Sequence, residues 1–200
     1  MDYGFENVSF LNRFIDIQQV FILPIPILSI IGKSGSGKTV LLEKIIPELK
    51  RRGYRVATIK HHFHPGFEID IPGKDTWRHA RAGSDQVIIA GPDRIASIRL
   101  LERELTLDEI VERLIAPGIP TVDIILTEGF KRAGKPALEV VRLKNGLDLI
   151  SSAGQLAAVA TDTPMQLAVP QFDLDDATQI VDFIENCFLK NTNESKRSPG

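Results

Sequence analysis

The 200-residue sequence predicts a three-layer α/β protein, in which a mostly parallel sheet carries helices on both faces. Three observations support this prediction. Short apolar runs alternate with segments of helical periodicity along most of the chain. A glycine-rich octapeptide, residues 32–39, stands between the first apolar run and the first helical pattern. No long linker divides the chain, so residues 25–189 are expected to form one domain.

The octapeptide reads Gly-Lys-Ser-Gly-Ser-Gly-Lys-Thr and fits the phosphate-binding pattern G-x-x-x-x-G-K-[ST] at every fixed position. In such a loop, backbone N–H groups and the N-terminus of the next helix point toward an anion. Lys38 is expected to reach the β- and γ-phosphates of a nucleotide, and the Thr39 hydroxyl to ligate Mg²⁺. The motif therefore predicts a P-loop NTPase fold. The residues expected to bind nucleotide are Gly32, Ser34, Gly35, Ser36, Gly37, Lys38, Thr39 and Val40.

Caps and periodicity place the remaining elements. The first helix is expected to end at about Arg52, because Gly53 is typical of a left-handed residue after a helix. Pro47 lies inside this helix and removes one hydrogen bond, so a kink is expected there. Thr106 and Glu109 form a capping box at the start of a later helix. Strands are expected at 25–31, 54–60, 86–90, 96–101, 122–127, 138–143 and 156–160, and helices at 74–82, 106–115 and 175–189.

The two ends of the chain carry weaker signals. Residues 1–24 are an N-terminal extension, for which a weak amphipathic helix and an artefact of the start site both stay open. The polar residues 190–200 are expected to be a disordered tail. The apolar run 20–31 is too short to span a bilayer and lacks the flanks of a signal peptide. A cytoplasmic protein without a membrane partner is therefore expected.

Composition excludes several other classes of protein. A formal net charge of −2 gives no electrostatic argument for a nucleic-acid partner. The single cysteine, Cys187, excludes an internal disulfide framework and a multi-cysteine zinc site. Because Cys187 lies in the apolar pattern of the last helix, it is expected to be buried.

A phosphate-loop protein needs an acidic group near Mg²⁺ at the end of a neighbouring strand. The apolar strand at 122–127 brings two candidates, Asp123 and Glu128. Ligands of a parallel sheet bind beyond the carboxyl ends of its strands, and the strand separates the two carboxylates by roughly 16 Å. Only Glu128 lies on the nucleotide side. We expect Glu128 to be the metal-linked or water-orienting acid, and Asp123 to be a capping or structural group.

The segment 61–73 leaves the end of the second strand without regular periodicity, as functional loops often do. A flexible polar loop, a transition-metal site at its three histidines, and a switch that contacts nucleotide or partner all stay open. No cysteine supports the metal site. In the switch interpretation, Asp70 reaches Mg²⁺ through a water molecule.

The helix that follows this loop has a basic face. Lys74, Arg78 and Arg81 are spaced so that they share one side of the helix. A solvated basic face and a site for an anionic second ligand both stay open.

Four segments, taken in order, carry a more specific signal than the phosphate loop alone. They are 31–39, 56–62 (Val-Ala-Thr-Ile-Lys-His-His), 72–79 (Pro-Gly-Lys-Asp-Thr-Trp-Arg-His) and 127–131 (Thr-Glu-Gly-Phe-Lys). With these segments the chain resembles the molybdopterin-guanine dinucleotide biosynthesis adapter proteins, the MobB family. Segments 136–142 and 158–162 extend the resemblance, which covers about residues 25–188.

The resemblance implies a GTP-binding adapter, usually a homodimer, with at most weak Mg²⁺-dependent GTPase activity that would depend on Lys38 and Glu128. Such an adapter assists the molybdenum cofactor guanylyltransferase, which attaches GMP to molybdopterin. His62, Lys74, Arg78 and Arg81 are expected to face molybdopterin, the partner enzyme or the second subunit.

Guanine recognition and two other functions remain open at this stage. No Asn-Lys-x-Asp motif is present. Asp162 either accepts hydrogen bonds from guanine or forms a turn before Thr163 and Pro164. A small-molecule kinase or ligase would use Arg78 and Arg81 to line an acceptor pocket. A metallochaperone GTPase would carry its metal on the histidines of the 61–73 loop.

Overall fold

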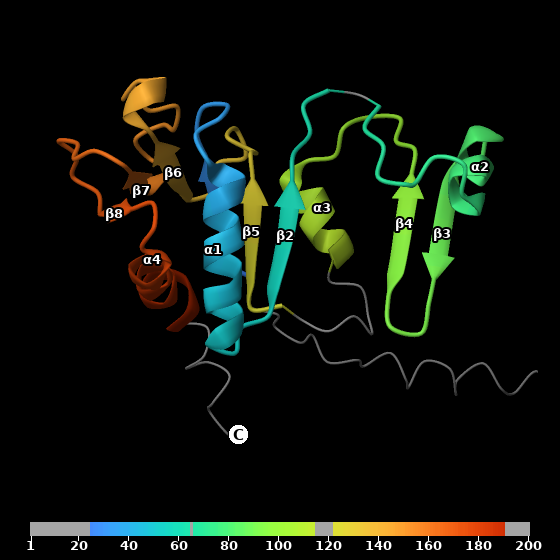
Figure 1. Cartoon of the computed structure of the whole chain (residues 1–200), viewed down its shortest axis with the longest axis horizontal. Coiled ribbons are helices and arrows are strands. Elements are labelled where there is room, and N and C mark those ends of the chain that lie inside the picture. Colours follow the sequence, from blue (N-terminus) through green and yellow to red (C-terminus); the bar gives the residue numbers. More distant parts are fainter. Residues whose placement is uncertain (1–24, 65, 115–121, 191–200) are drawn as a thin grey trace, which may run out of the picture.

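The computed structural model describes residues 25–64, 66–114 and 122–190. The extension at 1–24 and all but the first residue of the expected tail lie outside these ranges. The centre of the fold is a six-stranded sheet in the order β2-β5-β1-β6-β7-β8, with every neighbouring pair parallel (Figure 1). Its strands are β1 (Ile27–Ile31), β2 (Val56–Lys60), β5 (Ile124–Glu128), β6 (Ala137–Val141), β7 (Leu156–Thr161) and β8 (Gln171–Asp173).

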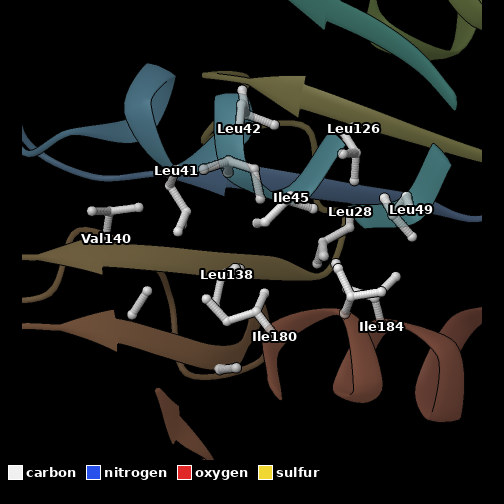
Figure 2. Packing of buried hydrophobic residues seen from close by; sticks show 14 of the residues in the cluster. Leu28, Leu41, Leu42, Ile45, Leu49, Leu126, Leu138, Val140, Ile180 and Ile184 are labelled. Carbon is white, nitrogen blue, oxygen red and sulfur yellow. The ribbon is translucent and has the colours of Figure 1, made fainter. Parts of the chain in front are cut away.

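Two helices pack together on one face of this sheet. They are α1 (Lys38–Arg51), which runs without interruption through Pro47, and α4 (Ala177–Ile184), which continues as a π-helical turn over Glu185–Leu189. Figure 2 shows the side chains that fill the space between these helices and the strands. The labelled residues, all buried, are Leu28, Leu41, Leu42, Ile45, Leu49, Leu126, Leu138, Val140, Ile180 and Ile184.

The central strands are buried on both faces, as their nearly continuous apolar sequence predicts. Residues 28–31 and 124–127 are at most 1% exposed, although alternate side chains of a strand point to opposite faces. The two polar residues of this set, Ser29 and Thr127, form a hydrogen bond with each other, in which Thr127 Oγ1 donates to Ser29 Oγ at 3.0 Å. The predicted mostly parallel α/β fold is confirmed.

A third helix, α3 (Leu107–Leu114), begins at the predicted capping box. The backbone N–H of Thr106 donates to Glu109 Oε2, and the backbone N–H of Glu109 donates to Thr106 Oγ1. An ion pair of 2.7 Å between Lys135 and Asp108 joins this helix to the segment that connects β5 with β6. None of the helices among the described residues is long and apolar enough to cross a membrane.

Strands β3 (Gln86–Ala90) and β4 (Ile95–Arg99) form a separate antiparallel hairpin, which sequence periodicity did not distinguish from strands of the main sheet. A short helix, α2 (Asp75–Arg81), packs beside β3. Figure 1 places this hairpin and α2 at one end of the molecule and β6–β8 at the other. The hairpin is thus a unit separate from the six-stranded sheet.

Two short elements of the structure were not predicted, and one local expectation is contradicted. The last strand, β8, and a short 3₁₀ turn at Leu143–Asn145 (η2) are each only three residues long, too short for a periodic signal. The expectation that Cys187 is buried is wrong. The π-helical turn directs Leu189 inward, where it is 1% exposed, and leaves Cys187 on the outer side.

Candidate functional site

The phosphate loop joins the buried end of β1 to the start of α1. Gly35 and Gly37 have φ angles of 71° and 99°, in the left-handed region where a side chain is unfavourable. Gly37 is the N-cap of α1, and its carbonyl accepts the backbone N–H of Leu41 at 2.9 Å. The loop therefore turns tightly around the helix N-terminus, which is the arrangement that binds phosphate in proteins.

Lys38 lies inside this loop. Its Nζ donates to the carbonyl oxygens of Gly32 at 3.1 Å and Lys33 at 3.0 Å. Burial lowers the pKa of the Lys38 ammonium, an effect that Glu128 opposes and Lys60 reinforces. A partly desolvated ammonium held by neutral carbonyls is well prepared to bind a phosphate oxygen, because the charge lacks a full counter-ion.

Glu128 ends β5 and meets Thr39 across the mouth of the loop. The Thr39 hydroxyl lies 3.0 Å from both carboxylate oxygens of Glu128, which is 14% exposed. Lys60, at the end of β2, places its Nζ 2.7 Å from Glu128 Oε1. The convergence follows from topology: β1 and β2 both pair with β5, so the three segments end at one edge of the sheet.

The hydroxyl oxygen of Thr39 and the carboxylate oxygens of Glu128 are suitable ligands for Mg²⁺, which prefers hard oxygen atoms. This ion usually binds through only a few protein ligands. A single carboxylate beside the loop hydroxyl is the usual set when phosphate oxygens complete the coordination. The residues present therefore fit a nucleotide-associated magnesium ion.

A second set of contacts braces the loop from the opposite side, where β6 ends. Arg142 Nε donates to the carbonyl of Ser36 at 2.9 Å, and its guanidinium lies 3.4 Å from the point that a Cβ on Gly37 would occupy. Lys33 Nζ reaches back to the carbonyl of Asn145 in η2 at 3.0 Å. The buried Ser36 hydroxyl has no hydrogen-bond partner among the described residues. The phosphate loop is thus supported by side chains on both flanks.

Asp162 follows β7, further along the same edge. Its Oδ1 accepts the backbone N–H of Leu143 at 2.9 Å, and its Oδ2 lies 3.7 Å from Arg142 Nη1. The carboxylate is therefore already engaged with the segment that braces the loop. Guanine recognition by Asp162 remains a prediction, and it would require the base to share or replace these contacts.

The 61–73 loop begins beside this cluster, where the backbone N–H of His61 donates to the carbonyl of Glu128 at 2.9 Å. The His62 ring is 5.6 Å from the Phe67 ring and 6.0 Å from the His64 ring. Asp70 accepts the backbone N–H of Ile71 and lines a groove of about 200 Å³ beside β3 and β4. No hydrogen bond joins Asp70 to Thr39 or Glu128 in the part of the chain that the structure describes. Within the same ranges, no group of three or more His, Cys, Asp or Glu side chains is arranged to hold a metal ion.

The basic face of α2 is partly neutralised by its own neighbours. Arg81 pairs with Glu68 at 2.8 Å and lies over the ring of Trp77 at 5.2 Å. Arg78 is 3.9 Å from Asp75. Lys74, the N-cap residue, is exposed. The helix lies beside the hairpin, not beside the phosphate loop (Figure 1), so its role toward a second ligand or partner remains a prediction.

Sequence reasoning missed Lys60 and Arg142, although both obey the rule that identified Glu128. Each lies at or directly after the carboxyl end of a parallel strand. A Mg²⁺ ligand supplies an oxygen atom, so that rule points to acids at the strand ends and passes over lysine and arginine at the same edge. The strand order, which the sequence does not show, decides which of these ends lie near the phosphate loop.

Comparison with known proteins gives a consistent result. Residues 27–162 match the family model described as molybdopterin guanine dinucleotide synthesis protein B. The chain is 40% identical over 162 residues to a molybdopterin-guanine dinucleotide biosynthesis adapter protein of Haemophilus influenzae, with 81% of this chain and 89% of the relative covered. It is 35% identical over 167 residues to the adapter protein of the same description from Escherichia coli, covering 80% and 91%.

A solved structure supports the same relationship. The crystal structure of molybdopterin-guanine biosynthesis protein B superposes with a TM-score of 0.63 at 33% sequence identity. The match covers 80% of this chain and 98% of the solved chain.

Proposed function

The chain belongs to the molybdopterin guanine dinucleotide synthesis protein B family, and from this premise we propose that it is a GTP-binding adapter. Its place in molybdopterin-guanine dinucleotide biosynthesis and its character as a P-loop nucleotide-binding protein follow from the family. The adapter would assist the guanylyltransferase that attaches GMP to molybdopterin. The main observation in support of a nucleotide site is the contact between Thr39 and Glu128 beside Lys38, at the mouth of the loop.

We propose that Lys38 and the loop N–H groups hold the β- and γ-phosphates of GTP. Thr39 and Glu128 would hold Mg²⁺, which neutralises phosphate charge when it is bound. Glu128 would also orient the attacking water in a slow hydrolysis, because positioning and electrostatic stabilisation supply most of the catalysis in phosphoryl transfer.

We further propose that the protein is a homodimer assembled through the β3–β4 hairpin. A two-stranded hairpin alone is marginally stable in water, and its open edges can pair with another chain. In this hairpin, the exposed fractions of Ile88, Ile89 and Ile95 are 55%, 57% and 71%. A second copy of the chain would cover these side chains. The basic face of α2, with His62 of the neighbouring loop, would then lie near the subunit boundary, available to molybdopterin or to the guanylyltransferase.

Calorimetric titration with GTP and with ATP, each with and without Mg²⁺, tests the nucleotide proposal. We expect tighter binding of GTP than of ATP and weaker binding when Mg²⁺ is omitted. Replacing Lys38 with alanine should weaken GTP binding by about 10- to 100-fold, because it removes a charge-assisted contact to phosphate.

Lys50→Ala is the matched control, since Lys50 lies on the same helix with its side chain exposed. It should bind GTP like the unaltered protein. Equal affinity of folded Lys38→Ala for GTP would contradict the phosphate-loop assignment. A preference for ATP would instead favour a kinase or ligase.

A further inference from the structure

Lys60 places a second ammonium group at the mouth of the phosphate loop. Its Nζ lies 2.7 Å from Glu128 Oε1, the same oxygen that accepts from the Thr39 hydroxyl at 3.0 Å. The parallel register makes Lys60 and Glu128 direct neighbours at the carboxyl ends of β2 and β5. The chain thus holds a cation beside its metal-binding acid.

We propose that Lys60 binds the terminal phosphate of GTP, so that the site prefers GTP to GDP. This inference rests on the proposed nucleotide-binding function and adds to it the residue that senses the γ-phosphate. Lysine binds phosphate as a flexible point charge. It would be a specificity-determining residue that acts in the same subunit.

The strand order assigns Lys60 to the terminal phosphate and not to the base. From the phosphate loop after β1, the sheet continues through β5 to β2 on one side and through β6 to β7 on the other. Glu128 and Lys60 end the first pair of strands, and Asp162 follows β7. Since the metal ion bridges the β- and γ-phosphates in P-loop proteins, the Glu128 side is the side of the terminal phosphate.

Lys60 is free to exchange partners. Its side chain is 62% exposed, so packing does not hold the ammonium against Glu128. Because the lysine end of this ion pair lies in solvent, water and salt screen the attraction. A phosphate group carries more charge than one carboxylate, and a divalent cation held by Thr39 and Glu128 would repel the ammonium at this distance. Both effects favour transfer of Lys60 from Glu128 to the phosphate.

Lys60 and Lys38 both lie beside the pair formed by Thr39 and Glu128. Lys60 contacts Glu128 Oε1 at 2.7 Å, and Lys38 is the chain neighbour of Thr39 at the start of α1. A polyanion bound at the mouth of the loop would attract both ammonium groups. GDP ends at the β-phosphate and would leave Lys60 without that partner.

The test compares the affinities of Lys60→Met, Lys60→Arg and the unaltered protein for GDP and for the β,γ-imido analogue of GTP. Calorimetry with Mg²⁺ measures binding without hydrolysis. Lys60→Met should bind the triphosphate analogue about 10- to 100-fold more weakly, since one charge-assisted contact is lost, and should bind GDP as before. Lys60→Arg keeps the charge and should retain most of the preference for the triphosphate.

Lys131→Met is the control, because Lys131 is an exposed lysine a few residues beyond Glu128. It should leave both affinities unchanged. If Lys60→Met shifts both affinities by the same factor, or neither, Lys60 is only an ion-pair partner of Glu128 and the inference is wrong. If the unaltered protein binds neither nucleotide, the proposed function fails as well, so the two failures are distinguishable.

Discussion

The residues after β5 have the most constrained backbone of the site. Gly129 has a φ of 97°, and the next residue, Phe130, has a φ of 55°, which is unusual for a bulky side chain. Hydrogen bonds hold this turn from both sides, from His61 N–H to the carbonyl of Glu128 and from Gly129 N–H to the carbonyl of Ile30. The Phe130 ring lies 4.8 Å from the His61 ring. The strained turn therefore fixes the position of Glu128.

Gly129→Ala should destabilise the protein by about 1–3 kcal/mol, because alanine is strained in the left-handed region. The added Cβ would also lie 3.1 Å from the Cβ of His61. Urea unfolding measures the change. Gly154→Ala is the matched control, since a Cβ there meets no atom within 4 Å and no left-handed backbone is required. Equal stability of the two variants would show that this turn is not strained.

Charged side chains join helix α1 to the C-terminal helix that begins with α4. Arg52, directly after α1, donates to Glu48 on α1 and to Asp182 and Glu185 on the C-terminal helix. Arg51 adds two hydrogen bonds of 2.7 Å to Glu48. These contacts surround the end of the apolar interface between the two helices, so they fix how the helices meet while the buried side chains supply the larger part of the stability.

The Glu48 contacts predict a specific dependence of stability on pH. Hydrogen bonds from Arg51 and Arg52 lower the pKa of Glu48 to about 2. A lowered acid pKa stabilises the folded state above the pKa of the unfolded chain, about 4.3, and this contribution is lost as pH falls toward 2. The free energy of unfolding of Glu48→Gln should therefore lie below that of the unaltered protein at pH 7, with a difference that shrinks below about pH 4.

Urea unfolding at several pH values measures this difference. Glu43→Gln is the control, because it removes the same charge from an exposed position of α1. A difference for Glu48→Gln that stays constant down to pH 3 would mean that the Arg51 and Arg52 contacts do not stabilise the folded state in solution.

The molecule as a whole consists of a nucleotide-binding sheet at one end and an apolar hairpin at the other (Figure 1). If the hairpin joins two copies, the two phosphate loops lie on the outer parts of an elongated dimer.

Ile95→Asp tests the assembly, because a carboxylate on β4 cannot be buried against a second copy without a large desolvation cost. We expect light scattering to show a monomer for this variant and a dimer for the unaltered protein. The only tryptophan, Trp77 on α2, lies near the hairpin, so its emission should also respond to dissociation.

Leu143→Asp is the matched control for assembly, since Leu143 is 61% exposed in η2, at the other end of the molecule. It should remain a dimer. If the Ile95→Asp variant forms a dimer as stable as that of the unaltered protein, the subunit interface does not include the β3–β4 hairpin.

Local sequence patterns predicted most of the elements within a few residues. The glycine loop between an apolar strand and a helix, the capping box at Thr106 and the buried strand before Glu128 each depend on short-range chemistry, which one sequence shows directly. The three-residue strand β8 was missed because it is too short to establish a period. The exposure of Cys187 was missed because the final turn is a π-helix, which rotates the side chains away from the helical pattern.

The sequence by itself determined the P-loop fold, the glycine-rich loop between β1 and α1, and the position of Glu128 at the end of a neighbouring strand. These features depend on residue order and on the rule that parallel strands end at one edge. Only the tertiary structure decided that β5 lies between β1 and β2, which brings Lys60 to Glu128, and that β6 carries Arg142 to the phosphate loop. It also separated the β3–β4 hairpin from the main sheet. Strand order and register depend on contacts between segments that are distant in the chain. A local sequence pattern therefore does not show which strands pair with each other.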